Sequence, residues 1–269
     1  MPRLWVLNLD AEVELSGRTP SRAARERTHA WAEEVAATLP EGDAWIEHVE
    51  GDARGWEGAA WCPTPSALQQ LSSRGASLPG SPGVGVLRRV NDRAFAFALH
   101  ALPDARRIRD SSMLVVAQGD RVWLRRGLAF AGRGVRRVEG PATEEDLRFV
   151  EASLRRGSVF LEPQVEVLLD VSLHGHTDGR RGQLTVATLD RGQWRNSRLA
   201  TDEVTVAERD CMHATVESVA AALDQAGYTG PFGIDGFRYR DAHGDVRFHP
   251  LSDLNARYSM GWPVGMGGW

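Results

Sequence analysis

The chain has 269 residues, of which 42% are hydrophobic and 25% are charged, and its formal net charge is -4 at pH 7. This length can bury a substantial core, either in one domain or in two or three closely packed ones. No apolar run approaches the roughly 18 residues needed to span a bilayer, so no membrane span is expected. The acidic balance argues against a nonspecific nucleic-acid binder, which needs basic residues to neutralise phosphates.

The sequence gives no indication of export. Asp10, Glu12 and Glu14 stand where a signal peptide would carry its small-residue cleavage site. Cys62 and Cys211 lie far apart and belong to no Cys-x-x-Cys motif, so no disulfide framework is expected. These features predict a cytoplasmic protein.

The sequence contains no lysine, so all 32 basic side chains are arginine. A strongly GC-biased genome is the favoured explanation. The alternative is an enzyme that modifies lysines and avoids modifying itself. In either case the chain has no lysine amine that could form a Schiff base.

The first hundred residues have the pattern of an α/β unit. Short apolar runs predict strands at residues 4–9, 44–49 and 59–62. Helices are predicted at residues 22–39 and 65–73, the first of them beginning after Thr19-Pro20-Ser21. Residues 77–82 are rich in Gly, Pro and Ser and indicate a loop or a boundary.

The middle of the chain is predicted to alternate between helices and short strands. A helix at 91–100 precedes two strands, 113–117 and 122–128, which flank a Gly119-Asp120 turn. A glycine-bearing loop at 127–134 follows, with arginines on both sides. Thr143 and Asp146 have the spacing of a capping box, which predicts a helix over 143–155.

The last part of the chain predicts an antiparallel sheet and one long helix. Strands are expected at residues 158–165, 167–173, 184–190 and 194–199. The helix is expected at 215–226, with Gly227 in a C-cap position. Two final strands, 232–239 and 246–254, would be joined by a hairpin turn at 241–245.

The final hairpin carries the residues that most strongly indicate chemistry. Asp235 lies on its first strand, and Asp253 and Asn255 lie two positions apart on its second. Alternation places Asp253 and Asn255 on one face, and antiparallel pairing can bring Asp235 alongside them. Two carboxylates and an amide oxygen suit Mg²⁺, which commonly takes further ligands from nucleotide phosphates. An isolated Asp-x-Asn would more often cap a turn, but these strands otherwise read as buried, where a charge needs a partner.

The same segment resembles the ATP-grasp superfamily, the enzymes related to D-alanine ligase and glutathione synthetase. The resemblance rests on Gly230-Pro231-Phe232-Gly233, the acidic Asp235, and the run Asp253-Leu254-Asn255-Ala256-Arg257, in which Asp253 stands where Glu is usual. It implies that Asp235, Asp253 and Asn255 hold Mg²⁺ on the ATP phosphates. It also implies that Arg257 steadies the phosphate or an acyl-phosphate intermediate.

Three further segments resemble parts of the same superfamily. Glu162, within Phe160-Leu161-Glu162-Pro163, matches the hinge that binds adenine, and Asp170 matches the downstream acid that binds ribose. The stretch Gly132-Arg133-Gly134 resembles the glycine-rich lid, whose backbone can approach the phosphates closely. A strand-end charge is the alternative for Glu162.

Two arginines stand where the superfamily usually has lysines that hold phosphate. Arg125, next to Arg126, matches the lysine on the strand before the lid, and Arg93 matches an earlier one. Arginine can hold phosphate bidentately, but the replacement is not geometrically conservative. A solvated or nucleic-acid-binding face is the alternative for the arginine-flanked loop at 127–134.

The histidines are weaker candidates for chemistry. His174 and His176 near Asp178 could be mistaken for a metal pair, but a satisfied or exposed histidine at a strand end is the commoner case. His249 lies next to the acidic site and could act as a general base on an incoming amine.

The resemblance implies an ATP-grasp fold of mixed α/β and α+β class. Its expected parts are an N-terminal α/β domain at 1–105, a lid subdomain at 106–160, and a C-terminal antiparallel subdomain with the metal site at 161–269. It implies a ligase that uses ATP and Mg²⁺ to activate a carboxylate as an acyl phosphate, which an amine attacks to form an amide. The expected partners are small-molecule or peptide carboxylates and amines, and a homodimer is left open. The alternatives are an inactive nucleotide-binding or interaction protein and a kinase-like member.

Overall fold

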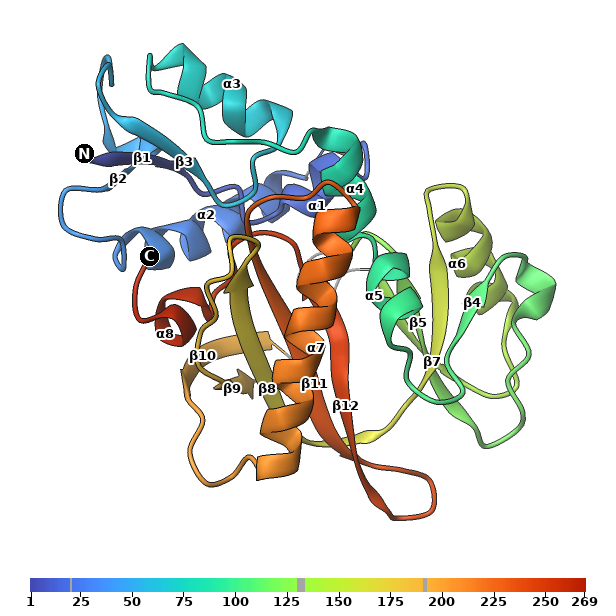
Figure 1. Ribbon diagram of the computed structural model, residues 1–269. Coiled ribbons are helices and arrows are strands. Elements are labelled where there is room, and N and C mark those ends of the chain that lie inside the picture. The colour runs from blue at the N-terminus through green and yellow to red at the C-terminus, as the bar shows by residue number, and fades with distance from the viewer. Residues whose placement is uncertain (20, 130–133, 191–192) are drawn as a thin grey trace.

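A computed structural model describes residues 1–19, 21–129, 134–190 and 193–269 (Figure 1). The strands in these ranges form a three-stranded sheet in the order β2-β1-β3, a four-stranded sheet in the order β4-β7-β5-β6, and a five-stranded sheet in the order β10-β9-β8-β11-β12. The sheets follow one another along the chain. None of the described helices combines the length and apolar character needed to cross a membrane.

The N-terminal sheet is parallel, with β1 (Arg3–Val6) between β2 (Ala44–Trp45) and β3 (Glu57–Ala60). Parallel neighbours need a crossover, which α1 (Ala11–Leu15) and α2 (Arg22–Ala36) supply here. Helix α3 (Pro65–Ser73) follows β3. The predicted α/β opening is confirmed, although a short 3-10 helix, η1 (Ile46–His48), replaces most of the strand predicted at 44–49.

Two short helices, α4 (Val84–Asn91) and α5 (Arg93–Leu99), replace the single helix predicted at 91–100. The chain breaks at Asp92, whose backbone is extended and whose carboxylate accepts a hydrogen bond from the N–H of Ala94 at 2.9 Å. This cap starts α5 and fixes the direction in which Arg93 leaves the backbone. Helix α5 packs against β12 of the C-terminal sheet.

The four-stranded sheet comprises β4 (Arg106–Ile108), β5 (Arg121–Arg126), β6 (Val135–Glu139) and β7 (Val159–Pro163). It forms a separate apolar core together with α6 (Glu144–Leu154). The predicted capping box of α6 is confirmed, because the side chains of Thr143 and Asp146 each accept a hydrogen bond from the other's backbone N–H. Strand β7 crosses residue 160, where a boundary is predicted, so the division into domains remains a prediction.

The strand predicted at 113–117 is wrong. A short 3-10 helix, η2 (Ser111–Met113), leads into residues without regular structure. The side chains of Leu114 and Val116 are nevertheless buried in the core of the four-stranded sheet. The apolar pattern at these positions reflects burial and not strand pairing. In a short run the two give the same pattern.

The five-stranded antiparallel sheet comprises β8 (Glu166–His176), β9 (Thr185–Asp190), β10 (Gln193–Leu199), β11 (Pro231–Arg240) and β12 (Val246–Asn255). Helix α7 (Val206–Gln225) covers one face, as Figure 1 shows in orange. The helix begins well before the predicted 215 because Thr205 and Glu208 form a second capping box. Gly227 follows its end with a φ of 77°, in the predicted C-cap position.

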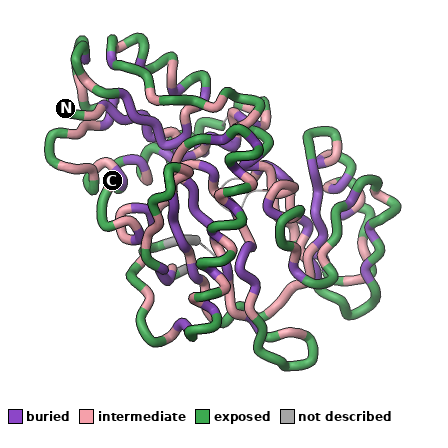
Figure 2. The backbone as a smooth tube through the Cα atoms, viewed as in Figure 1, coloured by how far each residue is buried: buried purple, intermediate pink, exposed green. Residues whose placement is uncertain are grey.

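The N-terminal and C-terminal sheets share one continuous apolar core, and Figure 2 shows the buried residues following their strands. The chain returns to the N-terminal sheet after β12, through α8 (Trp262–Met266). The ring of Trp269 then lies 5.4 Å from that of Trp5 and 5.8 Å from that of Tyr258, measured between centroids. Its indole N–H donates to the carbonyl of Thr38 at 2.9 Å.

Candidate functional site

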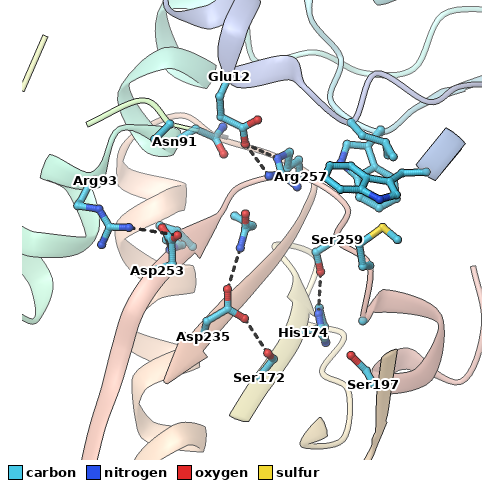
Figure 3. Close-up of a pocket in the computed structure, with 18 of the residues that line it drawn as sticks. Glu12, Asn91, Arg93, Ser172, His174, Ser197, Asp235, Asp253, Arg257 and Ser259 are labelled. Carbon is cyan, nitrogen blue, oxygen red and sulfur yellow. Dashed lines mark hydrogen bonds and ion pairs between the residues drawn. The ribbon is translucent and has the colours of Figure 1, made fainter. Parts of the chain in front are cut away.

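A cavity of about 520 Å³ opens where the C-terminal sheet, the end of β5 and the N-terminal unit meet. Its walls carry both carboxylates and arginines, together with the aromatic residues Trp31 and Trp61. Seven of the residues predicted from the sequence or adjacent to them line it, namely Arg93, Arg125, Arg126, Asp235, Asp253, Asn255 and Arg257. Figure 3 shows Arg93, Asp235, Asp253 and Arg257 among the side chains around this cavity. The cavity is therefore the candidate site.

Asp235 and Asp253 lie directly opposite each other in the register of β11 and β12, next to a β-bulge between Asp235 and Phe237. The Oδ1 atom of Asp235 accepts a hydrogen bond from the Ser172 hydroxyl at 2.6 Å, and its Oδ2 atom accepts one from the Asn255 amide at 3.0 Å (Figure 3). The structure therefore brings the three predicted metal ligands to one cavity wall.

Burial raises the pKa of Asp235 to about 6, and the charges of Asp253 and Asp170 add to this effect. The hydrogen bond from Ser172 opposes it. Two carboxylates held close together at a cavity wall favour a cation between them. Among the described residues no group of three or more His, Cys, Asp or Glu side chains could hold a metal. A metal at this wall would therefore have two carboxylates and the Asn255 amide, and would need further oxygen atoms from a ligand.

Arg93 on α5 contacts both β12 and β7. From α5 its Nη1 atom donates to the Ser252 carbonyl at 2.7 Å, and its Nη2 atom lies 3.3 Å from the Asp253 carboxylate. Nη1 also lies 3.4 Å from Glu162 on β7. Arg125 on β5 approaches the other oxygen of Glu162 at 3.1 Å. The Glu162 carboxylate thus aligns two guanidinium groups beside the carboxylate pair.

Arg257 forms an ion pair with Glu12 that the sequence analysis did not anticipate. Its Nε and Nη2 atoms both lie 2.6 Å from Glu12 Oε1, and both side chains are almost fully buried (Figure 3). Burial is the largest single influence on the pKa of Arg257 and lowers it, but the charge and hydrogen bond of Glu12 together with the charge of Asp253 raise it overall, so the guanidinium remains protonated. The signal in the sequence was that Glu12 lies between Ala11 and Leu15 on the apolar side of a short helix. It was read only as part of an acidic run.

His174 also lines the cavity, although the sequence analysis discounted it. Its Nε2 atom lies 2.8 Å from the Ser259 hydroxyl. Burial lowers the pKa of His174 to about 4, so the ring is neutral at pH 7. A Cβ atom at Gly233 or Gly261 would lie 3.0 or 2.9 Å from the ring, so the imidazole fits because these positions have no side chain.

Not every predicted residue lies at the cavity. Asp170 shares a strand face with Ser172 by alternation but is not among the lining residues, and burial raises its pKa. His249 is likewise outside the lining, and its ring lies 5.2 Å from that of Phe237. Of the predicted lid glycines, Gly134 is described, with a φ of 78°. Gly132 and Arg133 lie outside the described residues.

No protein-family model matches the sequence, and no curated protein matches it. Solved structures do match. D-alanyl-alanine synthetase A from Vibrio cholerae is 11% identical with a TM-score of 0.55, over 98% of this chain and 90% of that one. D-cycloserine synthetase DcsG is 15% identical with a TM-score of 0.53, over 99% and 95%. Carboxyaminoimidazole ribonucleotide synthase from Aspergillus clavatus, complexed with ATP, is 13% identical with a TM-score of 0.50, over 96% and 70%.

These matches cover nearly the whole chain and define its architecture. The chain has the ATP-grasp fold, which confirms the fold predicted from the sequence. The match covers 90% of D-alanyl-alanine synthetase A and 95% of D-cycloserine synthetase, so this chain is close to both proteins in length. At these levels of identity the likeness concerns the fold alone.

Proposed function

We propose that this protein is a carboxylate–amine ligase that uses ATP and Mg²⁺. The observation that carries the proposal is the meeting of Asp235, Asp253 and Asn255 with Arg93 and Arg125 at one cavity. Oxygen ligands beside fixed guanidinium groups are what a metal-bound polyphosphate requires. Two of the structural neighbours named above are synthetases, and the third is a synthase complexed with ATP, which supports the same interpretation.

In this proposal Arg93 and Arg125 hold the phosphates of ATP. Both guanidinium groups are already oriented by Glu162, so little side-chain entropy is lost when phosphate binds. Asp235, Asp253 and Asn255 hold Mg²⁺, which neutralises the charge of the phosphates when it is bound. Glu162 and Asp170 do not line the cavity, so their expected contacts with adenine and ribose remain predictions.

The reaction begins when a carboxylate oxygen of the substrate attacks the terminal phosphorus of ATP. The P–O bond to ADP breaks, and an acyl phosphate forms. An amine nitrogen then attacks the acyl carbon, inorganic phosphate leaves with the bonding electron pair, and the nitrogen loses a proton. Arg257 stabilises negative charge that develops on the acyl phosphate, since positioning and electrostatics dominate such transfers.

The opposite end of the cavity is the proposed place for the organic substrates. Glu12 and Trp61 line the cavity, and each has a buried polar atom, Oε2 and Nε1 respectively, with no hydrogen-bond partner among the described residues. Buried polar atoms are normally satisfied, so these two are assigned to a ligand or to water. Glu12 would accept a hydrogen bond from a substrate amine, while Ser259, held by His174, would contact a substrate oxygen.

The proposal is tested by measuring the binding of a non-hydrolysable ATP analogue by calorimetry with and without Mg²⁺. We expect Asp235→Asn and Asp253→Asn each to weaken the Mg²⁺-dependent binding at least about 100-fold, because a metal ligand is lost. The control is Asp245→Asn, which removes an exposed acid from the turn of the same hairpin. An affinity for the analogue that is unchanged by removal of Mg²⁺ and by both cavity variants would contradict the proposal.

Release of ADP with a panel of amino acids then separates the alternatives. A ligase releases ADP only when a carboxylate and an amine are both present. Its product has the mass of the two substrates joined by an amide bond, with one water lost. Analogue binding without turnover on any substrate would favour an interaction protein. A product that carries a phosphoryl group on a hydroxyl would favour a kinase-like member.

A further inference from the structure

A second, smaller cleft lies next to the cavity, at the end of β5. Arginines contributed by distant parts of the chain line it, namely Arg18 after α1, Arg88 on α4, Arg126 on β5 and Arg156 after α6. Arg126 and Gly127 line both this arginine cleft and the catalytic cavity. The cleft therefore spans the N-terminal unit and the four-stranded sheet.

None of the four arginines of the cleft forms an ion pair with a described carboxylate. Arg18 donates to the Ser16 hydroxyl at 2.7 Å, and Arg126 donates to the Ser153 hydroxyl at 2.8 Å. The guanidinium of Arg126 also lies over the Phe149 ring, 4.9 Å from its centroid. These contacts are with neutral groups, so they orient the guanidinium groups without neutralising them.

Asp92 is the one acidic residue that lines the arginine cleft among the described residues. Its carboxylate accepts the capping hydrogen bond from Ala94 and lies against the backbone of Gly127. One carboxylate leaves the cleft with an excess of positive charge, in a chain whose overall net charge is negative.

The electrostatic cost of this cluster can be seen at Arg126. Burial lowers the pKa of Arg126, and the neighbouring charges of Arg18 and Arg156 lower it further. Arginine does not lose its proton in response, so the charges remain and their repulsion destabilises the folded protein. A bound anion would remove this repulsion and could accept hydrogen bonds from several guanidinium groups at once.

We propose that the arginine cleft binds a phosphate group of a small molecule, at a site separate from the catalytic cavity. Guanidinium groups bind phosphate in preference to smaller monovalent anions because the fork matches two phosphate oxygens. A small anion fits better than a nucleic acid, because the charge is confined to one cleft and the chain as a whole is acidic.

Binding of inorganic phosphate tests the proposal, measured by calorimetry at constant ionic strength with chloride as the competing anion. We expect the double variant Arg88→Ala/Arg156→Ala to weaken phosphate binding at least about tenfold, because two of the four guanidinium groups are lost. The matched control is Arg89→Ala/Arg155→Ala. It removes the adjacent exposed arginines, which do not line the cleft, and it changes the net charge equally.

The cavity must be separated from the cleft in the same experiment. Arg125→Ala alters the cavity alone, so phosphate binding to the cleft is expected to persist in this variant. An equal loss in the control double variant, or loss in Arg125→Ala alone, would overturn the proposal. If inorganic phosphate does not bind but a single-stranded oligonucleotide does, and Arg88→Ala/Arg156→Ala removes that binding, the cleft is instead a nucleic-acid site. None of these outcomes depends on whether the protein is a ligase.

Discussion

In the cavity of the candidate site, Arg93 and Arg125 contact the same carboxylate, Glu162, whereas in the arginine cleft Arg88 and Arg156 contact none among the described residues. The two sites meet at Gly127 and differ mainly in how their positive charge is balanced. In the cavity the protein's own carboxylates neutralise the arginine charges, so these side chains are in place before a ligand arrives. In the cleft most of the neutralising negative charge would come from a ligand. Removing an arginine should therefore have opposite effects on stability at the two sites.

The largest effect is expected for Arg93→Ala. This change leaves Glu162 with one arginine partner and Asp253 with none, and it removes the donor to the Ser252 carbonyl. Loss of one member of a buried charge cluster typically costs about 3–5 kcal/mol of unfolding free energy. Urea unfolding measures it, with the exposed Arg89→Ala on the preceding helix as control. A loss below about 1 kcal/mol would show that the cavity is not balanced as described.

Gly127→Ala should disturb both sites, because this residue separates them. A Cβ atom there would lie 2.4 Å from an oxygen of Asp92, the residue that caps α5. We expect a cost of about 1–3 kcal/mol, since either the cap or the backbone must move. Asp92→Ala combined with Gly127→Ala relieves the collision. Thermal unfolding of the single and double variants should therefore give a double variant that loses less than the sum of the two single changes.

The pH dependence of the cavity should follow Asp235. Its pKa of about 6 without metal lies above the ordinary aspartate value of 3.8, so the folded protein retains this proton while pH rises to about 6. The stabilisation that comes from the protonated form is present at lower pH and is lost as pH rises through about 6. Metal must displace the same proton, so cation affinity should fall about tenfold for each pH unit below about 6.

Electron paramagnetic resonance with Mn²⁺, in the absence of nucleotide, measures this affinity. Asp235→Asn should bind Mn²⁺ weakly at every pH, and its stability should no longer decrease between about pH 4 and pH 6. An affinity that stays constant from pH 5 to pH 7 in the unaltered protein would contradict the assignment of Asp235 as a ligand.

The smallest effect is expected for Arg156→Ala in the absence of phosphate. Because this change removes repulsion toward Arg126 and breaks no ion pair within the part of the chain that the structure describes, stability should rise by at most about 0.5 kcal/mol at low salt. The gain should vanish at high salt, where exposed charges are screened. Urea unfolding at two salt concentrations measures it, with Arg155→Ala as control. A clear destabilisation would show that Arg156 has a structural role in the fold.

The sequence predicted the C-terminal sheet well because its strands alternate regularly and its turns carry Gly and Asp. Asp235, Asp253 and Asn255 could be placed together because one hairpin contains them all, so register alone sets their distance. Glu12 and Ser172 could not be placed, because their partners are far away in the sequence and depend on how the sheets pack. The strand predicted at 113–117 failed because burial without pairing leaves the same apolar pattern.

The register of β11 and β12 also bears on how the site assembles. Antiparallel neighbours joined by a tight turn have low contact order, so this hairpin can form early, before the N-terminal unit has closed over it. Arg93, which pairs with Asp253 of the hairpin, lies on α5 and reaches it only with the longer-range contacts. During folding the two opposed aspartates therefore repel each other until Arg93 docks, and divalent cations in the refolding buffer should speed the final step.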